Sequence, residues 1–304
     1  MNFPKFSDKF TLDRLELPLT GILNMVLDTD TYNEVDDQFA LVYALKSVER
    51  LNVQAVYAAP FHNDRSKGPE DGMEKSYEEI LRVLDKMNYK TSEGFVLKGS
   101  TRYLESIDTP CLSSASEDLV NRAMAATQPL YVVAIGAITN IASAILIEPR
   151  IIEKIVVVWL GGNALYWPHT FEFNLMQDVL AARVVFDSGV PLVQLPCENV
   201  VTHLQTTIDE LEHYLEGKSE IGTYLTKIVR EYTTNHFAWS KVIWDIAAIA
   251  YLINPDWLKT NLVHSPVLTD QVTWSVDQGR HFIRTAVSLN RDSIFGDLFT
   301  KIND

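Results

Sequence analysis

Short apolar runs rich in β-branched residues recur along the first two thirds of the chain, and longer segments with helical spacing of apolar residues lie between them. The apolar runs, each typical of a buried strand, are residues 22–27, 53–59, 95–98, 130–135, 155–160 and 192–195. The helical segments are residues 36–47, 73–87, 117–126, 139–147 and 178–188. This alternation predicts an α/β fold with an open, mostly parallel, Rossmann-like sheet and helices on both faces.

The pattern changes at about residue 205. Helical spacing dominates from there to residue 251, and a short strand-rich section is predicted at residues 265–287. No long linker rich in Gly, Ser or Pro divides the chain, and we find no internal repeat. We therefore expect residues 1–304 to form a single domain with a more helical C-terminal part.

The segment VLDTDTYNEVDDQFAL, residues 26–41, places four aspartates within ten positions: Asp28, Asp30, Asp36 and Asp37. The first two follow a predicted strand, and ligands of open parallel sheets bind beyond the carboxyl ends of strands. The other two would begin a helix, whose N-terminus favours acidic groups. Carboxylates this close repel one another, so they need a cation or must lose their charge. A hard divalent cation with oxygen ligands would resolve this conflict.

The acidic segment is also compatible in part with three other kinds of structure. Two aspartates could cap a helix while two decorate a loop, with no ligand. An EF-hand does not fit, because Asn33 and Phe39 stand where its glycine and glutamate are required. A haloacid-dehalogenase-like phosphatase would use Asp28 as nucleophile and Asp30 as acid/base. Tyr32 breaks that pattern, and the late acidic pair of such enzymes is incomplete in this chain.

The paired aspartates, followed by VDDQFAL, resemble the signature of the inosine-uridine preferring nucleoside hydrolase family. Three further segments resemble that family in the same order: VVAIGAITNIASAI (132–145), FEFNLMQDVLAARVVFDSGVPLVQLP (171–196) and VIWDIAAIAYLINP (242–255). The resemblance covers roughly residues 20–255. It implies the nucleoside hydrolase fold and hydrolysis of the N-glycosidic bond of a ribonucleoside or related ribosyl compound, as in purine or pyrimidine salvage.

The resemblance also implies a Ca²⁺ ion held by Asp30, Asp37, Asp245 and the backbone carbonyl of Ile135. Three carboxylates and a carbonyl make an oxygen shell with room for water and two sugar hydroxyls. Asp245 lies in an otherwise apolar helical stretch, where a buried carboxylate is costly without a partner; a helix cap is the alternative. Metal-bound water, activated by Asp30 as general base, would attack the anomeric carbon.

Four further residues are implied as sugar ligands. Asp36 would bind the 2-hydroxyl of the sugar, and Glu172 and Asn174 the remaining ribose hydroxyls. If the Glu-Phe-Asn segment is extended, its first and third side chains point the same way; a solvated strand edge is the alternative. Asn163, which follows WLGG, is the fourth candidate.

Residues around these candidates are expected to support the site. Asp28 would hold its loop by hydrogen bonds, and Thr139 and Asn140 would cap the helix that follows AIGAI. The polar segment 59–76 is predicted as a mobile lid, with an ordinary surface loop as the alternative. The aromatic segment 165–171 would form a wall for the base or sugar.

The chain departs from the family pattern in two places. The acidic segment has two extra residues and lacks the usual glycine. The position that often holds a histidine, which protonates the leaving base, is Trp244. Tryptophan can stack on a base or fill a core, but it has no titrating proton to donate. His62, His169 and His236 are candidates to replace it. We expect a divergent member with an undefined leaving group; a non-catalytic ribose- or nucleoside-binding relative is the alternative.

Composition narrows the possible partners. A net charge of −14 argues against nucleic acid and acidic membranes, since both attract basic surfaces. Cys111 and Cys197 show no CxxC spacing, so neither a disulfide framework nor a zinc cluster is expected. The charged start does not resemble a signal peptide and no long apolar run occurs, so we expect a cytoplasmic protein. The resemblance implies a small-molecule substrate and a homodimer or homotetramer.

Overall fold

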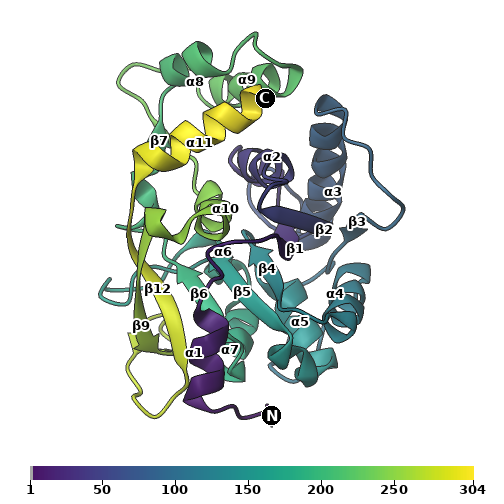
Figure 1. Ribbon diagram of the computed structural model, residues 1–304, viewed down its shortest axis with the longest axis vertical. Coiled ribbons are helices and arrows are strands. Elements are labelled where there is room, and N and C mark those ends of the chain that lie inside the picture. Colours follow the sequence, from purple (N-terminus) through teal and green to yellow (C-terminus); the bar gives the residue numbers. More distant parts are fainter. Residues whose placement is uncertain (1–2) are drawn as a thin grey trace.

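An eight-stranded sheet forms the centre of the computed structural model, which describes residues 3–304 (Figure 1). Its strands are β1 (Leu23–Thr29), β2 (Leu51–Ala58), β3 (Val96–Lys98), β4 (Leu130–Ala134), β5 (Ile155–Leu160), β6 (Leu192–Leu195), β9 (Leu258–His264) and β12 (Phe282–Leu289). They are ordered β3-β2-β1-β4-β5-β6-β12-β9, and only β12 and β9 pair antiparallel among these described strands. The predicted open, mostly parallel sheet is confirmed.

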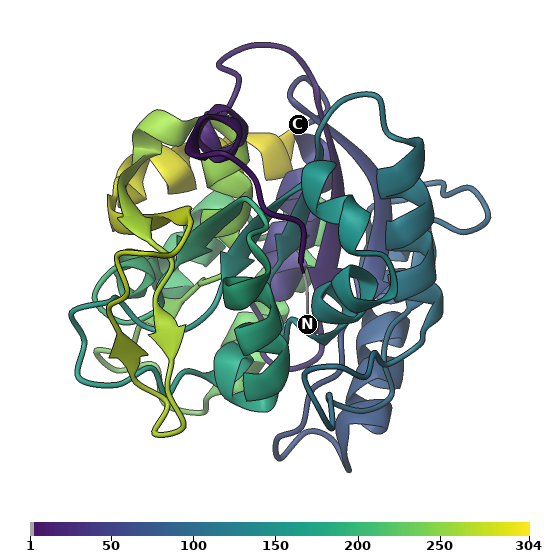
Figure 2. The same cartoon turned by 90° about the horizontal axis from the view of Figure 1, so that it is seen from below.

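Helices cover both faces of this sheet (Figure 1, Figure 2). One face carries α2 (Asp37–Lys46), α3 (Pro69–Lys86), α10 (Ile246–Ile253) and α11 (Arg291–Asn303), and the other carries α4 (Ser114–Ala125), α5 (Thr139–Ile147) and α7 (Val179–Ser188). The remaining elements are α1 (Asp8–Leu15), η1 (Pro149–Glu153), α6 (Phe173–Gln177), η2 (Val201–His203), β7 (Gln205–Thr206), α8 (Ile208–Tyr214), α9 (Glu220–Tyr232), β8 (Lys241–Val242), η3 (Pro255–Trp257), β10 (Val267–Leu268) and β11 (Trp274–Ser275). Over residues 3–304, every helix is too short or too polar to span a lipid bilayer.

The near-continuous apolar runs follow from burial on both sides. Successive side chains of a strand point to opposite faces, so Met25 and Leu27 enter one core while Val26 enters the other. Central parallel strands are therefore apolar at every position. In α2, every residue from Asp37 to Leu45 is buried, which places its first acidic residue inside the protein.

The strand order reverses direction next to β1. From β1 the chain moves outward to β2 and β3, and then returns to β4 on the other side of β1. The carboxyl ends of β1 and β4 therefore lie side by side, where the backbone N–H of Ile135 donates to the carbonyl of Asp28 at 2.9 Å. This is the topological switch point at which such sheets bind ligands.

Two local predictions were wrong in their bounds. The segment 59–76 is not one loop, because α3 begins at Pro69 and Pro is well suited to the first helical turn. The strand-rich section predicted at 265–287 contains β10, β11 and most of β12, but it begins too late, because β9 already spans Leu258–His264. As an edge strand, β9 leaves several positions exposed, which weakens its hydrophobic signal.

Asn140 was expected to cap α5, but it instead joins β1 to the segment that follows β3. The N-cap of α5 is Ile138, without a side-chain cap bond. The Asn140 amide donates to Asp28 Oδ1 at 2.7 Å, and its oxygen accepts from the backbone N–H and hydroxyl of Ser100 at 2.8 and 2.9 Å. Its neighbour Thr139 donates to Asp178 Oδ2 at 2.8 Å rather than capping the helix.

We therefore predict that Asn140→Ala lowers the free energy of unfolding by about 3 kcal/mol, because it leaves a buried carboxylate and a buried N–H without partners. Chemical denaturation followed by circular dichroism measures this loss. Asn52→Ala is the matched control, since it removes only an exposed amide contact with Asn24 and should change stability by less than about 0.5 kcal/mol. Equal losses in the two variants would contradict the bridging role of Asn140.

Candidate active site

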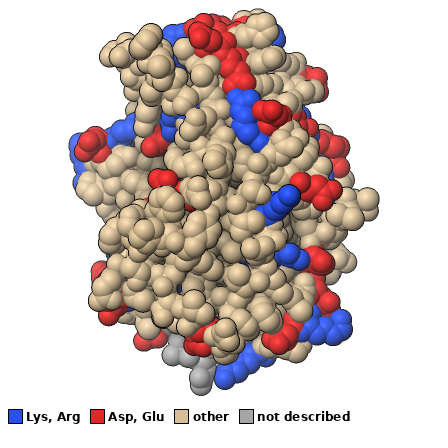
Figure 3. Space-filling view, turned by 90° about the vertical axis from the view of Figure 1, so that its left-hand side faces the viewer, with Lys and Arg blue, Asp and Glu red and all other residues tan. Residues whose placement is uncertain are grey.

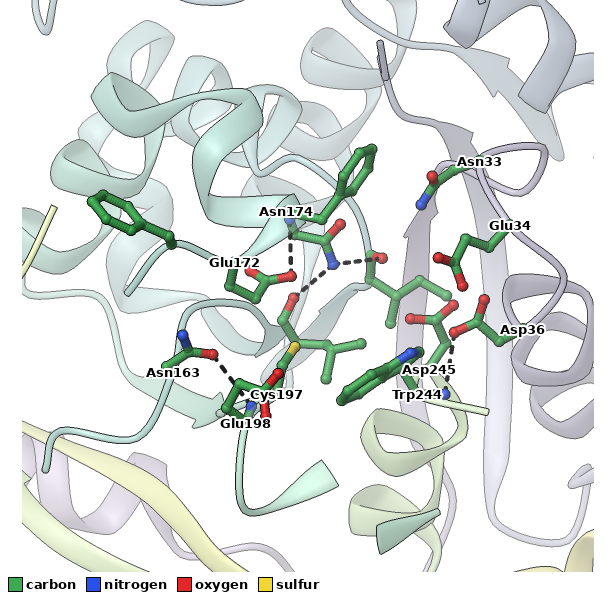
Figure 4. A pocket seen from close by; sticks show the side chains of 14 residues that line it. Asn33, Glu34, Asp36, Asn163, Glu172, Asn174, Cys197, Glu198, Trp244 and Asp245 are labelled. Atoms are coloured by element: carbon green, nitrogen blue, oxygen red, sulfur yellow. Dashed lines mark hydrogen bonds between the residues drawn. The ribbon is translucent and has the colours of Figure 1, made fainter. Parts of the chain in front are cut away.

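A cavity of about 240 Å³ lies beyond the carboxyl ends of β1, β4, β5 and β6 (Figure 4). It is lined by Asn33, Glu34, Asp36, Ile135, Leu160, Asn163, Phe171, Glu172, Phe173, Asn174, Cys197, Glu198, Trp244 and Asp245. Figure 4 shows two opposing sides. The β1–α2 loop and the start of α10 form one side, and the segments after β5 and β6 form the other.

Most residues proposed from the sequence meet at this cavity. Those that line it are Asp36, Ile135, Asn163, Glu172, Asn174, Trp244 and Asp245. Asp30 and Asp37 do not line it but are completely buried beside the lining aspartates. Asp28, which a phosphatase of the haloacid-dehalogenase type would need as nucleophile, is also completely buried and does not border the cavity.

Buried carboxylates crowd together beneath one side of the cavity. Oxygen atoms of Asp36, Asp37 and Asp245 lie within 4.8 Å of one another, and none of these residues is more than 3% exposed. Asp30 adjoins this group and packs against Gly136, where an added Cβ would lie 2.9 Å from the Asp30 carboxyl carbon. Both carboxylate oxygens of Asp30 and one of Asp37 have no hydrogen-bond partner among the described residues.

Burial, followed by mutual repulsion, makes these carboxylates hard to ionise. Burial is the main cause that raises the pKa of Asp37 to about 7 and that of Asp36 to about 6. The pKa values of Asp30 and Asp245 are raised well above their usual range, first by burial and then by the neighbouring aspartates. Unpaired buried oxygen atoms of this kind suit a hard divalent cation, so the residues present fit a metal site.

Hydrogen bonds from the strand ends hold the carboxylates in place. The Thr29 hydroxyl donates to Asp37 Oδ1 at 2.5 Å. The backbone N–H of Trp244 donates to Asp36 Oδ2 at 3.1 Å, which ties the start of α10 to the β1–α2 loop. As expected, Asp28 supports this region by a hydrogen bond, which it accepts from Asn140.

The Glu-Phe-Asn segment is not extended, because α6 begins at Phe173 and Glu172 is its N-cap. The Glu172 carboxylate accepts from the backbone N–H groups of Gly162, Asn174 and Leu175 at 2.7, 2.9 and 3.0 Å. It is therefore not a solvated strand edge, and burial raises its pKa. The cap still turns both residues of the pair toward the cavity.

The two asparagines of this side are held by backbone groups. The Asn174 amide donates to the carbonyls of Ile135 and Leu160, both at 3.0 Å, and so bridges the ends of β4 and β5. Asn163 is fully buried; its amide donates to the His169 carbonyl at 3.2 Å and its oxygen accepts from the Glu198 N–H at 3.2 Å. Both asparagines are thus fixed before any ligand arrives.

Sequence reasoning did not identify Asn33, Glu34, Cys197 and Glu198 among the polar residues that line the cavity, nor Lys241 beside it. Glu34 comes from the lengthened loop and forms an ion pair with Lys241, whose side chain is only 7% exposed. The charge of Lys241 lowers the pKa of the nearby Asp36 against the effect of burial. Cys197 and Glu198 follow β6 directly. The rule that ligands bind at carboxyl ends of strands would have singled out the last two.

The three histidines considered as leaving-group acids do not border the cavity. His62 is exposed and lies 3.4 Å from the Ser66 hydroxyl. His169 stacks on Phe171, and His236 contacts the carbonyl of Arg230 at 3.0 Å. Sequence alone could not place them, because each lies on a loop.

A sequence model of the family described as inosine-uridine preferring nucleoside hydrolase matches residues 25–295. The putative pyrimidine-specific ribonucleoside hydrolase RihB of Shigella boydii serotype 4 is 30% identical over 61% of this chain and 77% of its own length. Pyrimidine-specific ribonucleoside hydrolase RihB of Escherichia coli (strain K12 / DH10B) is 30% identical over 61% of this chain, but the match spans only 59% of that relative.

Solved structures share the fold. The purine-preferring ribonucleoside hydrolase from Gardnerella vaginalis superimposes with a TM-score of 0.77 at 20% identity, covering 92% of this chain and 98% of the other. The inosine-uridine preferring nucleoside hydrolase from Bacillus anthracis gives a TM-score of 0.71 at 15% identity, covering 93% and 99%. At these identities the likeness concerns the fold alone.

We predict that the metal-free protein loses stability as pH rises from 5 to 8. Asp28 and Asp37 have pKa values of about 7 in the folded protein, above the ordinary 3.8. Between these values the folded protein keeps protons that the unfolded chain has released. The free energy of unfolding therefore falls with pH, by about 1.4 kcal/mol per pH unit for each such proton.

Denaturation with a chelator at each pH measures this slope, and added Ca²⁺ should reverse the loss at pH 8. Asp37→Asn should flatten the slope. Asp292→Asn, at a side chain 92% exposed, is the control and should leave the slope unchanged. A free energy of unfolding that stays constant or increases over this range would contradict the raised pKa values.

Proposed function

The chain belongs to the inosine-uridine preferring nucleoside hydrolase family, and on this premise we propose that it is a calcium-dependent hydrolase of the N-glycosidic bond of ribosyl compounds. Membership places it among hydrolases that act on ribonucleosides. The observation that carries the calcium proposal is the group of buried aspartate oxygens without partners at the switch point of the sheet.

The proposed cation ligands are Asp30, Asp37, Asp245 and the carbonyl of Ile135. When bound, Ca²⁺ would offset the repulsion among the carboxylates, engage sugar hydroxyls and make a water molecule easier to deprotonate. The oxygen donors support a hard cation rather than a softer metal. The carbonyl of Ile135 already accepts from Asn174, so ligand binding would involve both groups.

We assign the reaction steps to residues as follows. Asp30 accepts the proton of the attacking water, which adds to the anomeric carbon as the bond to the base breaks. Asp36 binds the 2-hydroxyl, where an interaction strengthens as the transition state gains oxocarbenium character. On the opposite side of the cavity, Glu172, Asn174 and Asn163 hold the other ribose hydroxyls. Trp244 borders the cavity and would contact the leaving base.

A second candidate is a binding protein that retains the cation and ribose but does not turn over. The observation in its favour is Trp244, at a position where the family often has a proton-donating histidine. Ribose would stabilise such a binder, which would be measured as a rise in melting temperature. The binder would release no sugar from any ribosyl compound.

Assembly and location are further parts of the proposal. We propose a homodimer or homotetramer, in which the face with β9 and β12, where Figure 3 shows few charged side chains, would be available for contact. Both cysteines are free, which agrees with a reducing cytoplasm. The relatives named pyrimidine-specific make pyrimidine nucleosides the first substrates to test, in a salvage role.

We predict ribose release that depends on Ca²⁺ and is lost in Asp30→Asn. A reducing-sugar assay over a panel of nucleosides, with Ca²⁺ and then with chelator, measures it. The variant should lose at least about 100-fold in kcat/KM, as expected for a missing general base. Asp292→Asn is the control, because this exposed carboxylate lies outside the cavity. Full activity in the presence of chelator would disprove the calcium dependence.

A further inference from the structure

Asn33 lies in the lengthened β1–α2 loop and lines the cavity, but no step of the proposed reaction uses it. The residue is partly buried, and Figure 4 shows its amide at the edge of the cavity, on the same side as Glu34 and Asp36. The amide oxygen accepts from Asn63 Nδ2 at 2.9 Å, whereas the amide nitrogen makes no hydrogen bond to a residue of the described chain. This side of the cavity therefore keeps an N–H donor available for a ligand.

The orientation of the Asn33 amide follows from its neighbours. The backbone N–H of Arg65 can only donate, and it bonds to the side-chain oxygen of Asn63 at 2.8 Å. The amide nitrogen of Asn63 is thereby turned toward Asn33, where it donates to the carbonyl oxygen and to Oδ1 at 3.2 and 2.9 Å. Because the oxygen of the Asn33 amide is held on the Asn63 side, its nitrogen faces the cavity, as Figure 4 shows.

The loop around Asn33 is held from two directions. On the side of the β2–α3 segment, the Arg65 guanidinium donates to the Glu34 carbonyl at 2.8 Å and lies over the Tyr32 ring at 4.5 Å. On the side of the segment before α10, Lys241 forms the ion pair with the Glu34 carboxylate. A donor held in this way is ordered before the ligand arrives, so little conformational entropy is lost on binding.

The Asn33 amide complements the carboxyl groups on the same side of the cavity. Glu34, Asp36 and Asp245 also line it there. An ionised carboxylate only accepts hydrogen bonds, whereas a sugar hydroxyl both donates and accepts. A hydroxyl that donates to Asp36 still has lone pairs, as does the hydroxyl on the next carbon. A carboxylate and an amide side by side therefore suit a pair of neighbouring sugar hydroxyls.

We infer that Asn33 is a further substrate-binding residue, whose amide donates to an oxygen of the 2,3-diol of the ribosyl group, beside the hydroxyl assigned to Asp36. The inference rests on the proposed hydrolase function and adds a sugar contact to the same site. Asn63 is a positioning residue, because it acts through the orientation of the Asn33 amide. The lengthened loop thus takes part in recognition of the sugar.

Asn33→Ala tests the contact in protein with Ca²⁺. We expect kcat/KM for uridine to fall about 10-fold, mainly through KM, because one hydrogen bond to the bound sugar is lost. The loss should be the same for 5′-deoxyuridine, which keeps the diol. It should disappear for 2′-deoxyuridine or for 3′-deoxyuridine, whichever lacks the contacted hydroxyl.

Asn63→Asp tests the positioning role without removing Asn33. An ionised aspartate still accepts from the Arg65 N–H, but its second oxygen can only accept, so the Asn33 amide should turn its nitrogen away from the cavity. KM for uridine should then rise at least as much as in Asn33→Ala. The double variant should lose no more than Asn33→Ala alone, because Asn63 acts through Asn33. Asn52→Asp is the matched control, since it changes an exposed asparagine pair with Asn24 outside the cavity.

Ribose binding gives a second readout, which needs no turnover. With Ca²⁺, ribose should raise the melting temperature of the wild type and of Asn52→Asp, and should raise it less in Asn33→Ala and Asn63→Asp. KM values and ribose shifts equal to those of the wild type in both site variants would overturn the Asn33 contact and leave the hydrolase function intact.

Two other outcomes have different meanings. Additive losses in the double variant would overturn the positioning role of Asn63. Wild-type protein that releases ribose from no nucleoside would overturn the proposed function, and the ribose shifts of the variants would then decide the Asn33 contact by themselves.

Discussion

The site is arranged around a group of aspartate carboxyl groups that are buried, out of contact with water, at the end of β1. Asp28, Asp30 and Asp37 are completely buried, and Asp36 and Asp245 nearly so. Isolated buried charges of this kind are unfavourable by several kcal/mol each unless they are paired or neutralised. The surrounding fold offers Asp28 the amide of Asn140, but both oxygens of Asp30 remain unpaired in the described structure. A bound cation would offset the repulsion among these carboxylates, which would then serve as its specific ligands.

The sequence was sufficient to predict the sheet and the convergence of the acidic residues. Buried parallel strands are apolar throughout, so β4 and β5 were recognisable, and the switch-point rule placed the end of β1 at a ligand site. The family resemblance assigned Asp245 to the same cluster, and its place in an apolar helical stretch agreed with this, because a buried carboxylate needs a partner. Contacts made across the fold were not predictable. Nothing local shows that Asn140 reaches Asp28, or that Glu172 caps a helix whose second residue faces the cavity.

The lengthened β1–α2 loop distinguishes this site from the family pattern. It brings Glu34 to the cavity edge, where the ion pair with Lys241 joins the loop to the residues before α10. The same junction carries the bond from the Trp244 N–H to Asp36. The lengthened loop, Trp244 and Lys241 thus shape one side of the cavity. The opposite side, which carries Glu172, has the expected Asn163 and Asn174. The leaving-group side is therefore where specificity for a particular base would be decided.

A crystal structure of the protein soaked with Ca²⁺ and ribose tests the central claim most directly. The arrangement of buried carboxylates predicts one ion per chain, within about 2.3–2.6 Å of oxygen atoms of Asp30, Asp37 and Asp245. The ribose hydroxyls should lie against the same ion. A cavity with ribose but no ion, or an ion bound away from these aspartates, would contradict it.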